Sequence, residues 1–172
     1  MFWTPTTLPT DVCARICATL NARLADGVDL ASQLRVMRWN LHGVSFARVQ
    51  PLLHVIETDL EHRLDQIAER VSALGGRAFG SARYAAQASR INEFWSGALE
   101  ESDQVMLACD RISRFLDCTR ESRRICESLD DRDTAVILAA ILRDFERAIF
   151  TLRGAMDFAA GAISAAESRA AV

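Results

Sequence analysis

Residues 49–76 read VQPLLHVIETDLEHRLDQIAERVSALGG, and this stretch decides the fold. At about 100° of turn per residue, its apolar side chains fall on one face of a single long helix. They are Val49, Leu53, Ile56, Leu60, Leu64, Ile67, Val71 and Leu74. The Gly75-Gly76 pair that follows is a typical helix stop. The segment therefore predicts a helix that buries one face against other helices.

The opposite face of this helix carries polar side chains that a packed core does not need. Within a sector of about 100° lie His54, Glu61, His62, Asp65 and Glu69, with Gln50 at the edge. Imidazole and carboxylate groups in such a file can bind a transition metal. An ordinary solvated face gives the same pattern, and both interpretations stay open. Because this face points away from the core, a metal bound here needs further ligands from another chain, so metal binding predicts an oligomer.

The rest of the chain predicts three more long helices and one short one. Apolar residues recur at spacings of three and four over about 10–42, 94–128 and 133–165, and a short helix fits around 82–89. No strand pattern competes. A long middle connection between two helix pairs predicts an all-α, ferritin-like four-helix bundle whose crossover carries a short helix. We expect an N-terminal extension at 1–9, the bundle at 10–165 and a tail at 166–172.

Composition excludes several classes of protein. The 172 residues fit one domain, and no apolar run reaches the length of about 20 residues that a membrane span needs. The first residues lack the basic and apolar regions of a secretory signal. Five cysteines without a Cys-x-x-Cys pair favour a reducing compartment, and we expect a cytoplasmic protein. The chain has no lysine and a net charge of −3, so we expect no DNA binding.

Several runs in the sequence resemble the Dps mini-ferritins. They are Arg38-Trp39-Asn40-Leu41-His42-Gly43, Asp65-Gln66-Ile67-Ala68-Glu69-Arg70, Leu74-Gly75-Gly76, Asp130-Asp131-Arg132-Asp133-Thr134-Ala135 and Arg143-Asp144-Phe145-Glu146. The similarity covers roughly residues 20–158. The resemblance implies a hollow homododecamer that oxidises Fe(II), preferably with hydrogen peroxide, and stores the ferric product. It also implies ferroxidase sites between subunits related by a two-fold axis.

The metal ligands that the resemblance implies are only partly present. Asp65 and Glu69 stand where the family has its aspartate and glutamate. Arg38 replaces the histidine before Trp-Asn, Gln50 replaces a second histidine, and His54 replaces an aspartate. A guanidinium offers no lone pair to a cation, whereas an imidazole is a good ligand. We therefore expect Arg38 to pair with Asp65 or Glu69 across the interface, unless a metal occupies the site.

Two interpretations of this altered site follow. In the first, His54, Asp65, Glu69 and the weak ligand Gln50 bind iron, zinc or another divalent transition metal, and the protein is a ferroxidase with a changed site. In the second, Arg38 neutralises the carboxylates and the protein is a non-enzymatic shell, structural or metal-binding only. The sequence leaves open whether the protein is an enzyme.

The resemblance also suggests roles for residues outside the ligand set. Trp39 matches a tryptophan beside the iron site, with a buried interface aromatic as the structural alternative. Asp130 and Asp133 match a region that lines acidic pores through which Fe(II) enters, although acids at a helix start are favoured by the helix dipole in any case. Val136 stands at a position that is often acidic in relatives.

Overall fold

The computed structural model describes residues 6–43, 46–93 and 100–170, and of residues 101 and 157–170 only the backbone. Its helices are α1 (Thr10–Asn40), α2 (Phe46–Ala73), α3 (Ala82–Ala88), α4 (Glu101–Ser128) and α5 (Arg132–Ala170). Within these ranges there is no strand. The all-α prediction is confirmed.

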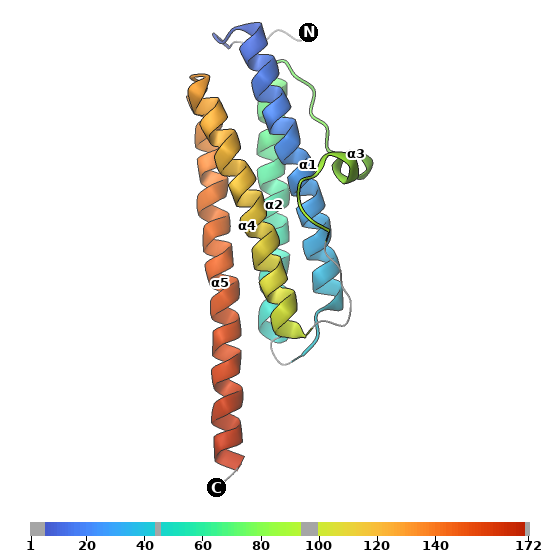
Figure 1. Cartoon of the computed structure of the whole chain (residues 1–172), viewed down its shortest axis with the longest axis vertical. Helices are drawn as coiled ribbons and strands as arrows, with labels where there is room; N and C mark the ends of the chain where they lie inside the picture. Colours follow the sequence, from blue (N-terminus) through green and yellow to red (C-terminus); the bar gives the residue numbers. More distant parts are fainter. Residues whose placement is uncertain (1–5, 44–45, 94–99, 171–172) are drawn as a thin grey trace.

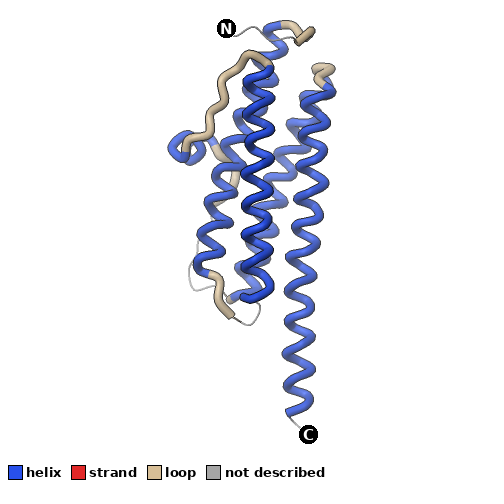
Figure 2. Tube along the Cα trace, turned by 180° about the vertical axis from the view of Figure 1, so that it is seen from behind, coloured by secondary structure: helices blue, strands red, loops and turns tan. Residues whose placement is uncertain are grey.

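The four long helices form two hairpins that pack side by side. α1 lies against α2, α4 lies against α5, and contacts of α1 with α4 and of α2 with α5 close the bundle (Figure 1). The long connection from α2 to α4 runs back outside the bundle and carries α3, which packs on α1. The view from behind shows the same arrangement (Figure 2). The predicted ferritin-like bundle with a crossover helix is therefore confirmed.

The observed helix ends differ from the predicted ones at two places. The predicted start of the third helix at Phe94 lies outside the described residues, and α4 is described from Glu101. α5 extends to Ala170, beyond the end predicted at 165, and projects past the other helices. Its last part is rich in alanine, which has the highest intrinsic helix propensity, so the helix continues without partners from the bundle.

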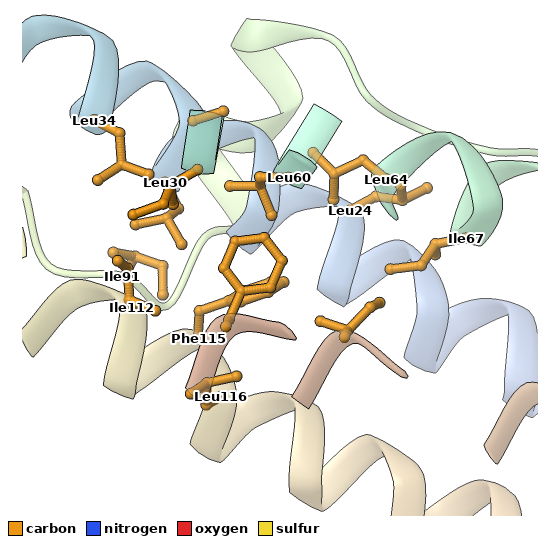
Figure 3. Packing of buried hydrophobic residues seen from close by; sticks show 14 of the residues in the cluster. Leu24, Leu30, Leu34, Leu60, Leu64, Ile67, Ile91, Ile112, Phe115 and Leu116 are labelled. Atoms are coloured by element: carbon orange, nitrogen blue, oxygen red, sulfur yellow. The ribbon is translucent and has the colours of Figure 1, made fainter. Parts of the chain in front are cut away.

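The apolar face of α2 forms the centre of the core, as predicted. All eight apolar residues of this face, counting Leu74 just beyond the helix end, are buried. Figure 3 shows Leu60, Leu64 and Ile67 of α2 facing Leu24 of α1 and Phe115 of α4. Each fully buried leucine or isoleucine contributes about 1.5–3 kcal/mol. This burial fixes the rotation of α2 and thereby turns its polar face outward.

Two glycines have structural reasons, one in the packing of α1 on α2 and one at the end of α2. A Cβ atom on Gly27 would lie 2.2 Å from Cδ2 of Leu64, so the glycine permits close approach of the two helices. From the sequence, Gly27 was expected only to interrupt the first helix, at a cost of about 1 kcal/mol in helix stability. Gly75 has φ 80°, a left-handed conformation that ends α2 as the predicted stop requires.

A buried ion pair lies where α1 meets the crossover, and the sequence pattern did not predict it. Arg23 Nη2 is 2.8 Å from Asp26 Oδ2, and the two side chains are 1% and 0% exposed. The backbone N–H of Arg90 in the crossover donates to Asp26 Oδ1 at 2.7 Å. Burial lowers the pKa of Arg23, and the charge of Asp26 opposes this shift. Asp26 therefore ties the crossover to α1.

Candidate metal site on helix α2

The polar face of α2 is exposed in the single chain. The side chains of His54, Glu61, His62, Asp65 and Glu69 are exposed, and Gln50 at the edge is half-buried. The helix therefore has the two faces that its sequence predicts. This places two imidazoles and three carboxylates on one outward surface over about four turns of helix.

A buried carboxylate beside this face was missed in the sequence. Glu57 has a side chain only 6% exposed, and it accepts from two arginines of α1. Arg35 Nε lies 2.5 Å from Glu57 Oε1, and Arg38 Nε lies 3.2 Å from Glu57 Oε2. Its burial could have been predicted from its angular position around α2. Glu57 follows the buried Ile56 and lies three residues before the buried Leu60, so it borders the apolar face.

Glu61 completes this group, which we call the Arg–Glu cluster: Arg35, Arg38, Glu57 and Glu61. Arg35 Nη2 lies 2.6 Å from Glu61 Oε1. The pKa of Arg35 is raised, chiefly because its guanidinium donates a hydrogen bond to Glu57. Two guanidinium charges are thus balanced by two carboxylate charges within one chain.

The candidate ligands have no such partners inside the chain. Among the described residues, the side chains of His54, Asp65 and Glu69 make no hydrogen bond or ion pair. Arg38, which we expected to pair with Asp65 or Glu69 of another subunit, pairs within its own chain with Glu57. In the described part of the chain, no three His, Cys, Asp or Glu side chains converge on one point as metal ligands. A complete site on this face therefore needs a ligand from another chain.

The donor set fits a divalent transition metal. Imidazole nitrogen is a borderline ligand, carboxylate oxygen is a hard one, and together they suit Fe(II) and Zn(II). Gln50 adds at most a weak neutral oxygen. The two carboxylates carry two negative charges, which one divalent cation balances.

The other histidines on this side have different surroundings. The ring of His62 lies 3.3 Å from the side-chain amide of Gln66, which in turn accepts from Arg63 at 2.7 Å. Arg63 also pairs with Asp144 of α5. His42, just after α1, has Nδ1 2.6 Å from the carbonyl oxygen of Asn40. These contacts hold each ring on the surface.

Exposed apolar side chains accompany the polar face. Trp39, next to Arg38 at the end of α1, is 67% exposed, and Val55, next to His54, is 55% exposed. Phe46 at the start of α2 is also exposed. Tryptophan side chains are highly buried on average in folded proteins, so the exposure of Trp39 is unusual. Exposed apolar side chains therefore lie at the end of α1, at the start of α2 and next to His54.

The acidic residues at the start of α5 fall into two environments. Asp130 and Asp133, the predicted pore residues, are 84% and 85% exposed, and the exposed Arg132 lies between them in the chain. Asp131 is buried, accepts from the backbone N–H of Thr134 at 3.1 Å and pairs with Arg70 at 2.7 Å. Asp131 therefore caps α5, whereas Asp130 and Asp133 are exposed to solvent in the single chain.

Comparison with known proteins places this fold in a family. A ferritin-like domain family matches residues 17–157. The DNA protection during starvation protein of Agrobacterium fabrum is 29% identical over 145 residues, which cover 84% of this chain and 90% of the relative. Antigen TpF1 of Treponema pallidum is 31% identical over 147 residues, covering 81% of this chain and 78% of the relative.

Solved structures show the same fold. DpsC from Streptomyces coelicolor superposes with a TM-score of 0.83 at 23% identity, covering 90% of this chain and 91% of that chain. The Dps protein from Vibrio cholerae, described as a member of a broad superfamily of ferritin-like diiron-carboxylate proteins, gives 0.80 at 22% identity, covering 90% and 98%.

The chain therefore belongs to the ferritin-like proteins and, within them, to the Dps family of DNA protection during starvation proteins. Membership supports a general role in iron storage and protection. None of the helices in the described residues is long and apolar enough to cross a membrane.

Proposed function

We propose that this protein is a Dps-type subunit that binds Fe(II) and oxidises it, with hydrogen peroxide as the oxidant, at an altered site between subunits. The ferric product would be stored inside a closed shell, which we take to be a dodecamer. Iron is the substrate and cargo here, and zinc or another divalent metal is the expected competitor for the same ligands.

One observation carries this proposal. Arg38 stands at a ligand position but is paired with Glu57 of its own chain, while the side chains of His54, Asp65 and Glu69 have no partner among the described residues of that chain. Exposed carboxylates without a partner are available to a cation. The arginine that argued against metal binding thus has its charge balanced elsewhere.

Each residue has a defined part in this proposal. Asp65 and Glu69 supply negative charge that lowers the free energy of the ferric state relative to the ferrous one. His54 supplies a neutral nitrogen ligand in place of an aspartate, which reduces the negative charge of the site. Trp39, exposed at the end of α1, would supply an oxidisable aromatic, and Asp130 and Asp133 would line the path for Fe(II) entry.

The second candidate is a shell without ferroxidase activity. It is favoured by the loss of two ligands, since Arg38 cannot bind a cation and Gln50 binds one weakly. Such a subunit would store or bind metal, or assemble with a competent relative. Binding to nucleic acid is not part of either proposal, because the net charge is −3 and the densest group of arginines, Arg120, Arg123 and Arg124, lies among acidic residues. We place the protein in the cytoplasm, since its five cysteines are free and buried.

The test is an anaerobic Fe(II) titration of the assembled protein, followed by stopped-flow mixing with hydrogen peroxide. Saturable binding at one or two irons per site, with oxidation faster than in protein-free solution, supports the first proposal. Oxidation no faster than that of free iron supports the shell.

The double variant Arg38→His with Gln50→His supplies the matched comparison. Both changes restore the residue types that the resemblance implies. A large gain in rate over the wild type means that the native site is inactive but the scaffold is competent. Little change means that His54, Asp65 and Glu69 already support turnover.

A further inference from the structure

His62 lies three residues before Asp65 on the polar face of α2, and both side chains are exposed. Helix positions three apart are neighbours on the surface, with Cβ atoms about 5–6 Å apart. His54 is eleven residues before Asp65, which corresponds to about 16 Å along the helix axis. Within one chain, therefore, His62 is the imidazole that can bind the same cation as Asp65, and His54 cannot.

The ring of His62 is directed toward the next turn of the helix. Its Nε2 atom lies 3.3 Å from Nε2 of Gln66, the residue that follows Asp65. Oε1 of Gln66 accepts from Nη1 of Arg63 at 2.7 Å, so the amide of Gln66 presents its NH2 group to the ring. Arg63 is in turn paired with Asp144 of α5. These contacts hold Nε2 of His62 toward the turn that carries Asp65.

The contact with Gln66 also determines which form of the ring is present. An amide NH2 group donates hydrogen bonds, so Nε2 of His62 accepts and carries a lone pair. A neutral imidazole nitrogen with a lone pair is the form that binds a transition metal. At 3.3 Å the hydrogen bond is long, so a cation can replace it at little cost.

We infer that His62 and Asp65 of one chain bind the same divalent transition metal. Di-iron carboxylate bundles use a ligand pair of the same spacing in the opposite order, Glu-x-x-His. Among the described residues no third His, Cys, Asp or Glu converges with this pair, so a second chain or water supplies the remaining ligands. The inference rests on the proposed function, because it adds to the same site a nitrogen ligand in place of one that is lost at Arg38 and Gln50.

The inference is tested with Co²⁺ alone, whose visible absorption reports binding to the assembled protein and changes when a nitrogen ligand is lost. We expect His62→Gln and Asp65→Asn each to lower Co²⁺ affinity about tenfold or more, and His62→Gln to shift the absorption bands. The side chains are exposed, so these variants are expected to fold as the wild type does.

Asp59→Asn is the matched control. Asp59 is exposed and lies three residues before His62, the same spacing as Asp65 on the other side. Because the ring contacts Gln66 and is directed away from Asp59, we expect this variant to keep the Co²⁺ affinity of the wild type. An Asp59→Asn variant that loses as much affinity as Asp65→Asn overturns the inference. Wild-type affinity and absorption in His62→Gln also overturn it, as does a wild type that binds no Co²⁺.

The iron titration separates this inference from the proposed function. Co²⁺ binding that depends on His62, in a protein that oxidises Fe(II) no faster than free iron is oxidised, refutes only the proposed function. Fast oxidation of Fe(II), with Co²⁺ binding that depends on His54 but not on His62, refutes only the inference.

Discussion

Removal of the Asp26 charge is expected to destabilise the fold severely, and the structure gives the size of the effect. Asp26→Asn retains an oxygen for the backbone N–H of Arg90 but leaves Arg23 without its counter-ion. Because both side chains are almost fully buried, solvent does not screen the loss. Breaking a buried ion pair from one side costs about 3–5 kcal/mol.

Removal of the Arg23 side chain should lower the free energy of unfolding much less. The three side-chain nitrogens of Arg23 make no hydrogen bond to the described residues, although Asp26 is close. Arg23→Met removes these unsatisfied donors and fills a similar volume, while Asp26 keeps its contacts with Arg90. We expect a loss of about 1–2 kcal/mol or less.

The two variants and their combination are compared by urea unfolding followed by circular dichroism. Subunit concentration is held constant because assembly contributes to stability. The double variant is expected to recover most of the stability lost in Asp26→Asn, since no unpaired guanidinium remains. An Arg23→Met variant as unstable as Asp26→Asn would refute this reasoning, as would a loss below about 1 kcal/mol in Asp26→Asn.

Three further predictions concern the end of the bundle where α2 and α4 end and α5 begins. Gly75→Ala places a Cβ in a left-handed conformation and should lower the free energy of unfolding by about 1 kcal/mol, measured by urea unfolding. Asp131→Ala removes the cap of α5 and the partner of Arg70, and should lower Tm more than Asp133→Ala does. Burial raises the pKa of Cys126 from 9.0 to about 12, so the folded state holds this proton more tightly and stability falls as pH rises from about 9 to 12. The slope is up to about 1.4 kcal/mol per pH unit, and Cys126→Ala should reduce it in unfolding curves recorded at several pH values.

Much of the fold was predictable because local patterns and the final structure agree. The period of apolar residues in α2 identified its buried face, and the glycine pair marked its end. The crossover followed from a stretch with a weaker pattern between two strongly periodic ones. The predicted end of α5 at 165 was too early, because the apolar period fades there whereas the alanine-rich segment stays helical to Ala170.

The candidate site was predictable only in part. The outward position of His54, Asp65 and Glu69 follows from helix geometry alone, once the apolar face is assigned. The partner of Arg38 does not follow, because it depends on which turn of α2 lies beside the end of α1. That register is set by the close contact between Gly27 and Leu64.

The sequence by itself therefore determined the helices, their buried faces, the family resemblance and the residues that could bind metal. Only the tertiary structure decided how the charges pair. Arg38 pairs with Glu57, because helix packing buries that carboxylate beside the two arginines Arg35 and Arg38. A pattern of residue types encodes faces through the 3.6-residue period, whereas ion pairs between helices depend on the distance and register of two packed surfaces.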